Sequence, residues 1–272
     1  MRYLSVCSGI EAASVAWESL GWTPVAFAEI ERFPSQVLAH HFPVVPNLGD
    51  MTKYKDWNID RNAVDLIVGG TPCQSFSVAG LRKGLEDPRG NLALTFIGMV
   101  DYYRPEWVIW ENVPGVLSSS GGRDFGSFLG ALGQLGYGFA YRVLDAQYFG
   151  VPITRKRVFV IGHIGTSWSK SFEVLFVHAN GKDGKKRGRA FPRSHSLTTQ
   201  NAGSKNARGN LIEECFGLRG MTPLECERAL GFPDGWTDIL PTTPEGPRYK
   251  ALGNSMAVPV MRWIGSRIQA CR

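Results

Sequence analysis

Hydrophobic and polar positions follow two different periods along the first 165 residues of the chain. Short apolar runs predict strands, and segments with apolar residues on one face predict helices. Strands are expected at residues 2–7, 24–29, 64–68, 107–110 and 158–161, and helices at residues 11–20, 33–41, 92–103 and 125–135. Strands that alternate with helices form βαβ units, so the pattern predicts an α/β fold with a doubly wound, mostly parallel sheet.

The pattern changes after about Thr166, where Gly, Ser, Asn, Lys and Arg become frequent. One strand is expected in this stretch, at residues 172–177. Helical patterns return at residues 222–230, where Thr222 precedes Glu225 by three positions as in a capping box, and at residues 256–268. We therefore predict a large domain at residues 1–165, a small region at 166–215, and a C-terminal segment at 216–272 that returns to the large domain.

Composition excludes several classes of protein. No stretch approaches the roughly twenty apolar residues of a membrane helix, and residues 1–6 do not resemble a secretory leader, so a cytoplasmic protein is expected. The five cysteines are odd in number and no pair has CxxC spacing. This argues against a disulfide framework and against a zinc site, and no metal is expected.

The net charge of +6 is a moderate basic excess, and its distribution is more informative than its size. A Gly-interleaved stretch at residues 182–193 holds the basic residues Lys182, Lys185, Lys186, Arg187, Arg189 and Arg193. A solvated loop and a surface that binds phosphates both explain this stretch.

The first strand runs into a turn that contains Ser8, Gly9 and Ile10, and Glu29 ends the second strand about twenty residues later. A turn open to a ligand, followed by an acid that can bind ribose hydroxyls, is typical of a nucleoside-cofactor site. The turn has one glycine, and Glu11 would repel a pyrophosphate, so a cofactor without phosphates fits better than a dinucleotide. An ordinary βα turn explains the segment equally well.

Cys73 follows the buried strand at residues 64–68 on a loop shaped by glycine and proline. Ligands of open α/β sheets bind at the carboxyl ends of strands, so Cys73 is a candidate nucleophile. A lone cysteine is usually a buried structural thiol, and that interpretation fits Cys7 and Cys226 better than Cys73.

Charged residues at two further strand ends complete the candidate chemistry. Glu111 ends the strand at residues 107–110, where a hydrophobic wall can raise its pKa and make it an acid. Capping a helix or binding an arginine would explain it too. Arg155 and Arg157 precede the strand at residues 158–161, and alternation places both on one face, where they can hold an anion or a carbonyl.

Together these segments resemble the DNA cytosine-5 methyltransferase family, in the order that the family uses. The match covers most of the chain. The similar segments are the nucleophile loop at residues 70–77, the acid motif at 111–113, the arginine motif at 147–157, the segment at 222–234 and the last motif at 253–259.

The resemblance implies a covalent mechanism on a cytosine flipped out of duplex DNA. Cys73 would add to C6, and Glu111 would protonate or hydrogen-bond N3. Arg157 would hold the base carbonyl, and Arg155 would support the loop and the phosphates. C5 would then take the methyl group of S-adenosylmethionine, leaving S-adenosylhomocysteine, and release of the C5 proton would free Cys73.

The resemblance also implies binding residues. Ser8, Gly9 and Ile10 would line the methionine end of the cofactor, and Glu29 would bind its ribose. Asp50 would accept from the adenine amino group, and the rest of the pocket would be Ile30 and Met51 on either side of the ring, with Pro72, Leu92, Asn254 and Met256. DNA would be bound by Gln74, Ser75, Ser77, Arg89, Lys185, Lys186, Arg187 and Arg189.

The chain departs from the family pattern at three positions. Cys7 stands where the family usually has an aromatic residue, and Glu11 stands where it has a second glycine. Both changes are expected to alter cofactor packing and affinity without changing the chemistry. Ile153 stands where the family often has glutamine, which removes a polar support of the arginines.

The region at 166–215 is the expected target-recognition region, and it is much shorter than a full recognition domain. We therefore expect a monomer that reads a short or relaxed site, largely through the DNA backbone. A second recognition chain is the alternative, and a cognate restriction enzyme is a further possible partner. Other activities stay open: a tRNA cytosine-5 methyltransferase of the same architecture, or a catalytically impaired DNA-binding relative. Glu11 argues against a dinucleotide oxidoreductase.

Overall fold

The computed structural model describes residues 1–72, 92–165, 168–176, 211–214 and 217–272. Short 3-10 helices connect several of the larger elements: η1 (Glu18–Leu20), η2 (Met51–Asp56), η3 (Arg61–Ala63), η5 (Pro114–Leu117), η6 (Ser119–Gly122) and η7 (Ala146–Phe149). Among the helices of these described ranges, none is long and apolar enough to cross a membrane.

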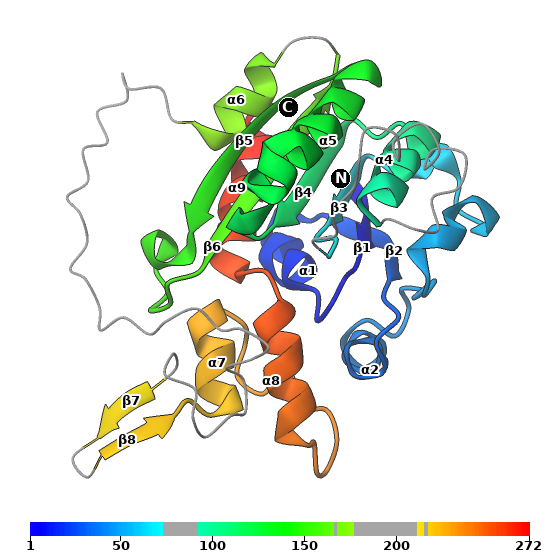
Figure 1. Cartoon of the computed structure of the whole chain (residues 1–272). Coiled ribbons are helices and arrows are strands. Elements are labelled where there is room, and N and C mark those ends of the chain that lie inside the picture. Colours follow the sequence, from blue (N-terminus) through cyan, green and yellow to red (C-terminus); the bar gives the residue numbers. More distant parts are fainter. Residues whose placement is uncertain (73–91, 166–167, 177–210, 215–216) are drawn as a thin grey trace.

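A six-stranded sheet forms the centre of the molecule (Figure 1). In spatial order its strands are β2 (Thr23–Ala28), β1 (Arg2–Val6), β3 (Leu66–Gly69), β4 (Trp107–Asn112), β6 (Lys156–Ile164) and β5 (Tyr137–Asp145). The first four are parallel, and β6 runs antiparallel to both β4 and β5. The predicted α/β fold with a mostly parallel sheet is confirmed.

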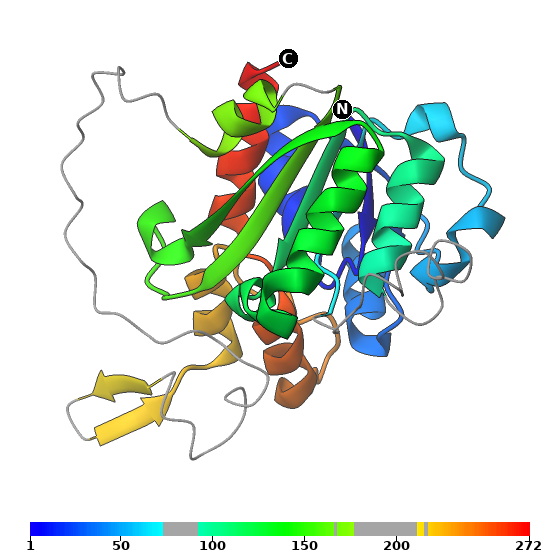
Figure 2. The same ribbon diagram turned by 45° about the horizontal axis from the view of Figure 1, so that its top comes forward.

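Helices cover both faces of the sheet, which explains why its central strands are continuous apolar runs. Helices α4 (Leu92–Tyr103) and α5 (Arg123–Gln134) lie on one face, and α1 (Ala12–Trp17) and α9 (Val258–Ala270) lie on the other (Figure 2). Successive residues of β4 alternate between the two cores: Val108 and Trp110 pack toward α4 and α5, whereas Trp107 and Ile109 pack toward α1 and α9. Every residue of β4 is buried.

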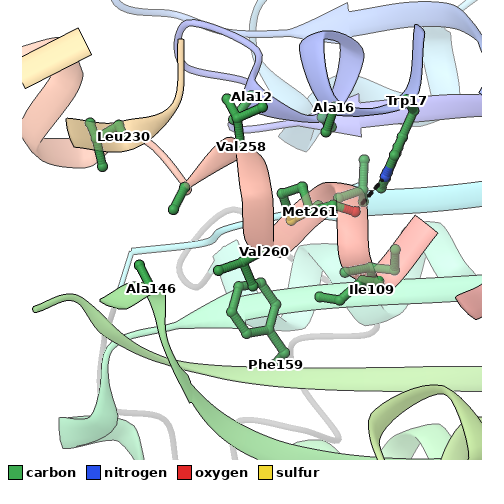
Figure 3. Close-up of a cluster of buried hydrophobic side chains, with 14 of the residues drawn as sticks. Ala12, Ala16, Trp17, Ile109, Ala146, Phe159, Leu230, Val258, Val260 and Met261 are labelled. Carbon is green, nitrogen blue, oxygen red and sulfur yellow. Dashed lines mark hydrogen bonds between the residues drawn. The ribbon is translucent and has the colours of Figure 1, made fainter. Parts of the chain in front are cut away.

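The last helix of the chain packs closely against the first one (Figure 3). The indole Nε1 of Trp17 donates to the carbonyl oxygen of Met261 at 2.8 Å. Gly265 makes this approach possible, because a Cβ at this position would collide with the Trp17 ring. The C-terminal segment is thus fixed to the first βα unit, which brings its preceding residues to the carboxyl edge of the sheet.

The remaining elements differ partly from the sequence predictions. They are α2 (Arg32–His41), α6 (Ser169–Leu175), the hairpin of β7 (Leu211–Glu214) and β8 (Gly217–Gly220), α7 (Pro223–Leu230) and α8 (Glu245–Asn254). The capping box of Thr222 and Glu225 at the start of α7 is confirmed.

The strand predicted at residues 172–177 is wrong, because this stretch lies largely in helix α6. Its buried residues Ser171, Val174 and Leu175 have the three- and four-residue spacing of a helix face. The Ser171 hydroxyl donates to the carbonyl oxygen of Gly138 at 2.7 Å, which fixes α6 on strand β5. Strand β5, helix α8 and the hairpin were not predicted.

Candidate active site at the carboxyl edge of the sheet

A cavity of about 680 Å³ opens at the carboxyl ends of β1, β2, β3 and β4. A smaller cavity of about 40 Å³ adjoins it and shares Cys7, Gly9, Gly70, Glu111 and Asn254 with it. The predicted residues that line the large cavity are Gly9, Glu29, Ile30, Asp50, Met51, Pro72, Leu92, Glu111, Asn254 and Arg157. The structure therefore brings together residues from most of the chain's length.

The turn after β1 is held in an unusual backbone conformation. Cys7, Gly9 and Glu11 all have positive φ values, of 49°, 58° and 64°. The Glu29 carboxylate accepts a hydrogen bond from the amide of Gly9 at 2.8 Å, so the predicted ribose-binding acid also shapes this turn. Left-handed conformations cost non-glycine residues about 1–2 kcal/mol each, so the turn needs such external support.

Three residues that were expected to contact the cofactor differ in position. Ser8 and Met256 line the small cavity instead of the large one. The Ile10 side chain is fully buried in the hydrophobic core around α1 and α9, and Ile10 lines neither cavity, which differs from the prediction that it lines the site.

Glu11 is turned into the protein beside the small cavity and does not line the large one. It is 1% exposed and accepts hydrogen bonds from the hydroxyl of Ser5 at 2.8 Å and from the amide of Ser14 at 3.1 Å. The second contact caps helix α1, which compensates for the left-handed backbone. Burial raises the pKa of Glu11 to about 7, against the three hydrogen bonds from Ser5 and Ser14 that lower it.

This buried acid predicts a pH-dependent stability. Between pH 4.5 and about 7 the unfolded chain ionises Glu11 while the native protein keeps it protonated. The native state then binds more protons, so the free energy of unfolding falls as pH rises through this window, on the order of 3 kcal/mol in total. Glu11→Gln keeps the capping oxygen and removes the ionisation.

Urea unfolding of both proteins between about pH 5 and about pH 8 measures this effect. We expect similar stabilities at the acidic end and a more stable variant at the basic end. Other groups with shifted pKa values remain in both proteins, so the difference between the two curves isolates Glu11. A difference that does not change with pH would contradict the assignment.

The adenine side of the predicted cofactor pocket has both polar and apolar groups. Asp50 caps η2 by accepting from the amide of Thr52 at 2.9 Å. Met51 is buried, and its sulfur lies 3.5 Å from the sulfur of Cys7. Ile30 is 72% exposed at the cavity, a large apolar surface that a ligand ring can cover. This set fits an aromatic base that carries an amino group.

Glu111 and Arg157 form an ion pair at the end of β4. The carboxylate Oε1 lies 3.0 Å from Arg157 Nε, and Glu111 is 8% exposed. Burial raises the pKa of Glu111, and the charges of Arg157 and Arg155 oppose that shift. Gly70 lies against the other oxygen, where a Cβ would approach Oε2 to 2.8 Å. The site thus holds a carboxyl group that is desolvated and oriented by a cation.

Strand β4 also fixes the chain that leads to Cys73. The indole Nε1 of Trp110 donates to the Thr71 hydroxyl at 2.9 Å, and Asn112 Nδ2 donates to the Thr71 carbonyl oxygen at 2.9 Å. Asn112 and Thr71 were not singled out from the sequence, although Asn112 follows Glu111 in the acid motif. Thr71 is therefore anchored next to the Glu111 edge, two residues before the candidate nucleophile.

Arg155 and Arg157 both lie near Glu111, as their charges on that group show, but they differ in what they contact. The guanidinium of Arg155 is 2% exposed and donates to the carbonyl oxygens of Gly253 at 3.0 Å and Ser255 at 2.5 Å. Burial lowers the pKa of Arg155 to about 9, together with the charge of Arg157 and against that of Glu111. These contacts fix the residues of the last motif.

Several predicted residues lie outside the described residues. They are the nucleophile Cys73 and the predicted DNA contacts Gln74, Ser75, Ser77, Arg89, Lys185, Lys186, Arg187 and Arg189.

Helix α8 forms a wall of the large cavity that the sequence did not indicate. Pro247, Lys250 and Ala251 of this helix line the cavity. Lys250 Nζ lies 2.6 Å from Glu31 Oε2 at the start of α2. The polar pattern of α8 carries no signal for this position.

Comparison with known proteins agrees with this geometry. The family model described as C-5 cytosine-specific DNA methylase matches residues 1–183 and 163–270. The type II methyltransferase M2.BsuMI of Bacillus subtilis is 28% identical over 98% of this chain and 75% of its own length. The Dnmt2 methyltransferase of S. pombe has the same fold, with a TM-score of 0.75, 18% identity and coverage of 99% of this chain and 98% of its own.

A protein of Escherichia phage P1 named DNA N-6-adenine-methyltransferase is 33% identical over 98% of this chain. The chain spans 61% of that relative's length. The alignment extends over 461 positions, many more than the 272 residues of this chain. The relative therefore has long insertions compared with this chain. The match of the family model to nearly the whole sequence shows that this chain belongs to the C-5 cytosine-specific DNA methylase family.

Proposed function

We propose that this protein transfers a methyl group from S-adenosylmethionine to C5 of a flipped cytosine in DNA through a covalent adduct on Cys73. One observation carries the proposal: the buried ion pair of Glu111 and Arg157 lies at the cavity edge to which Thr71 is anchored, two residues before Cys73. The Glu111 carboxyl group, the Arg157 guanidinium and Thr71, which precedes the nucleophile by two residues, therefore lie together at the carboxyl end of β4.

The large cavity fits S-adenosylmethionine by size and by chemistry. Its volume of about 680 Å³ is in the range of small-molecule sites. Glu29 offers a carboxylate for ribose hydroxyls, and Asp50 offers one for an adenine amino group. Ile30 and Met51 supply apolar surface for the ring, and the Gly9 turn leaves room beside the backbone. When bound, the cofactor supplies an electrophilic methyl group on a sulfonium sulfur.

The residues of this chain would prepare the cytosine for that methyl group. The Cys73 thiolate forms a bond to C6, and the electron pair of the C5–C6 double bond becomes available at C5. Glu111 places a proton at N3, and burial raises its pKa, which favours the protonated form that can act as the acid. Arg157 orients Glu111 and the base carbonyl. After C5 bonds to the methyl group, loss of the C5 proton expels Cys73.

The region at 166–215 is proposed to recognise the target, with Lys185, Lys186, Arg187 and Arg189 on phosphates and Gln74, Ser75, Ser77 and Arg89 near the flipped base. The long insertions of the phage P1 relative support the proposal that this chain has a reduced recognition region. A short or relaxed site follows, unless a second chain supplies recognition. We also propose that the protein is a monomer, with a cognate restriction enzyme as a possible partner.

Transfer of labelled methyl groups from S-adenosylmethionine tests this function directly. We expect the full-length protein to label duplex DNA and not transfer RNA, and digestion of the product to release 5-methylcytosine. A duplex that contains 5-fluorocytosine should trap the protein covalently, because loss of the C5 proton is blocked. If transfer RNA is labelled instead of DNA, the substrate is RNA. If the labelled product in DNA is N6-methyladenine, the proposed chemistry is overturned.

A further inference from the structure

Trp236 joins three segments that are distant in the sequence. It lies between α7 and α8, and its indole Nε1 donates to the Ile10 carbonyl oxygen at 2.9 Å. Its ring stacks on His41 at the end of α2, with centroids 3.6 Å apart and planes 1° apart. The backbone carbonyl of Trp236 also lies 2.8 Å from His41 Nε2. One residue of the C-terminal segment thus contacts both the β1 turn and α2.

A buried charge network holds the loop that presents Trp236. Glu227 of α7 is fully buried and accepts from the amides of Gly235 and Thr237, each at 2.8 Å. These two residues flank Trp236, so the backbone on both sides of Trp236 is fixed to α7. Arg248 of α8 donates to Glu227 at 3.2 Å and to the Thr237 hydroxyl at 2.9 Å. The loop position of Trp236 is therefore fixed by the hydrogen bonds of the buried residue Glu227 and of Arg248.

The group that Trp236 binds belongs to the turn at the cofactor cavity. Glu29 accepts from the Gly9 amide at 2.8 Å, and Trp236 donates to the carbonyl oxygen of the next residue, Ile10. The turn is therefore held from opposite sides by α7–α8 and by β2. Because Cys7 and Glu11 adopt the left-handed conformation on either side of Gly9, this turn would relax if one support were lost.

We propose that Trp236 is a positioning residue for cofactor binding, which keeps the Gly9 turn in the conformation that accepts S-adenosylmethionine. This proposal rests on the proposed function of the large cavity. Trp236 does not line either cavity that forms the candidate site, so it acts through the Ile10 carbonyl and not by touching the cofactor. The C-terminal segment would then influence the cofactor site from outside it.

Trp236→Phe tests this role because it keeps an aromatic ring that can pack on His41 and removes the N–H donor, together with part of the ring surface. We expect the dissociation constants of S-adenosylmethionine and S-adenosylhomocysteine to rise about tenfold, because the Ile10 carbonyl loses its hydrogen-bond donor and the turn loses one of its supports. Calorimetric titration without DNA measures both constants. In the cofactor-free protein, amide exchange should become faster in the peptide that covers residues 5–16.

Trp168→Phe is the matched control, since Trp168 is 61% exposed at the start of α6 and should leave both readouts unchanged. A merely structural role of Trp236 would lower the melting temperature and the active fraction without changing affinity. Wild-type protein that binds neither ligand would overturn the proposed function itself. Wild-type binding with equal affinity in Trp236→Phe would overturn this inference alone.

Discussion

Replacing Cys73 by alanine is expected to lower methyl transfer by about four to six orders of magnitude, the loss seen when a covalent nucleophile is removed. Without the bond from sulfur to C6, C5 of cytosine has too little electron density to attack a methyl group. The variant should also fail to form a covalent complex with 5-fluorocytosine DNA. Single-turnover assays with labelled cofactor measure the loss, and denaturing gels measure the adduct.

The contacts before Cys73 make this variant a clean test. Thr71 is held to β4 by Trp110 and Asn112, so the chain that leads to Cys73 is fixed by groups other than the thiol. Cofactor affinity and melting temperature should therefore match the wild type. Cys271→Ala is the matched control, because Cys271 ends α9 and pairs with Glu173, away from the cavity. A Cys73→Ala protein that still methylates DNA would exclude the covalent mechanism.

Much of the fold was predictable because the strands that carry the site are buried on both faces. Leu66–Gly69 is a short apolar run that leads to Cys73, and Trp107–Asn112 is an apolar run that ends in Glu111 and Asn112. Strand β5 gave a weaker signal. It lies at the edge of the sheet, and three successive residues, Tyr141, Arg142 and Val143, are exposed, so its pattern is neither continuous nor alternating.

The parts of the site that were not predictable depend on contacts between distant residues. Trp236 and Ile10 are separated by 226 positions, and no local pattern connects them. The contacts of Arg155 with the carbonyl oxygens of Gly253 and Ser255 likewise join positions that are 98 and 100 residues apart. Glu11 was judged by its charge, although its αL backbone and the nearby Ser5 and Ser14 direct the carboxylate inward.

Glu111→Gln is expected to lower kcat by about a hundred- to ten-thousandfold, the usual contribution of a general acid. The amide keeps the shape of the side chain and can still bond to N3 of the base, but it cannot transfer a proton. Negative charge then builds up on the ring when Cys73 adds to C6. Cofactor affinity should change little, because Glu29 and Asp50 are unaltered.

The pH dependence of the rate separates proton transfer from simple hydrogen bonding. A protonated Glu111 is the active form, so the wild-type rate should fall as pH rises through the raised pKa of this group. Glu111→Gln should lose this descent. Measurement of kcat across pH with saturating DNA and cofactor compares the two profiles.

Glu106→Gln provides the control, at the residue that precedes the same strand. Glu106 lies just before β4 at its opposite end and pairs with His163 at 3.6 Å, far from the carboxyl edge, so its rate should stay within about twofold of the wild type. Equal loss in both variants would indicate damage to β4 and not to catalysis. A Glu111→Gln enzyme with the wild-type rate and pH profile would show that N3 is protonated by another group or by water. The ion pair with Arg157 would then serve to hold the cavity edge in place.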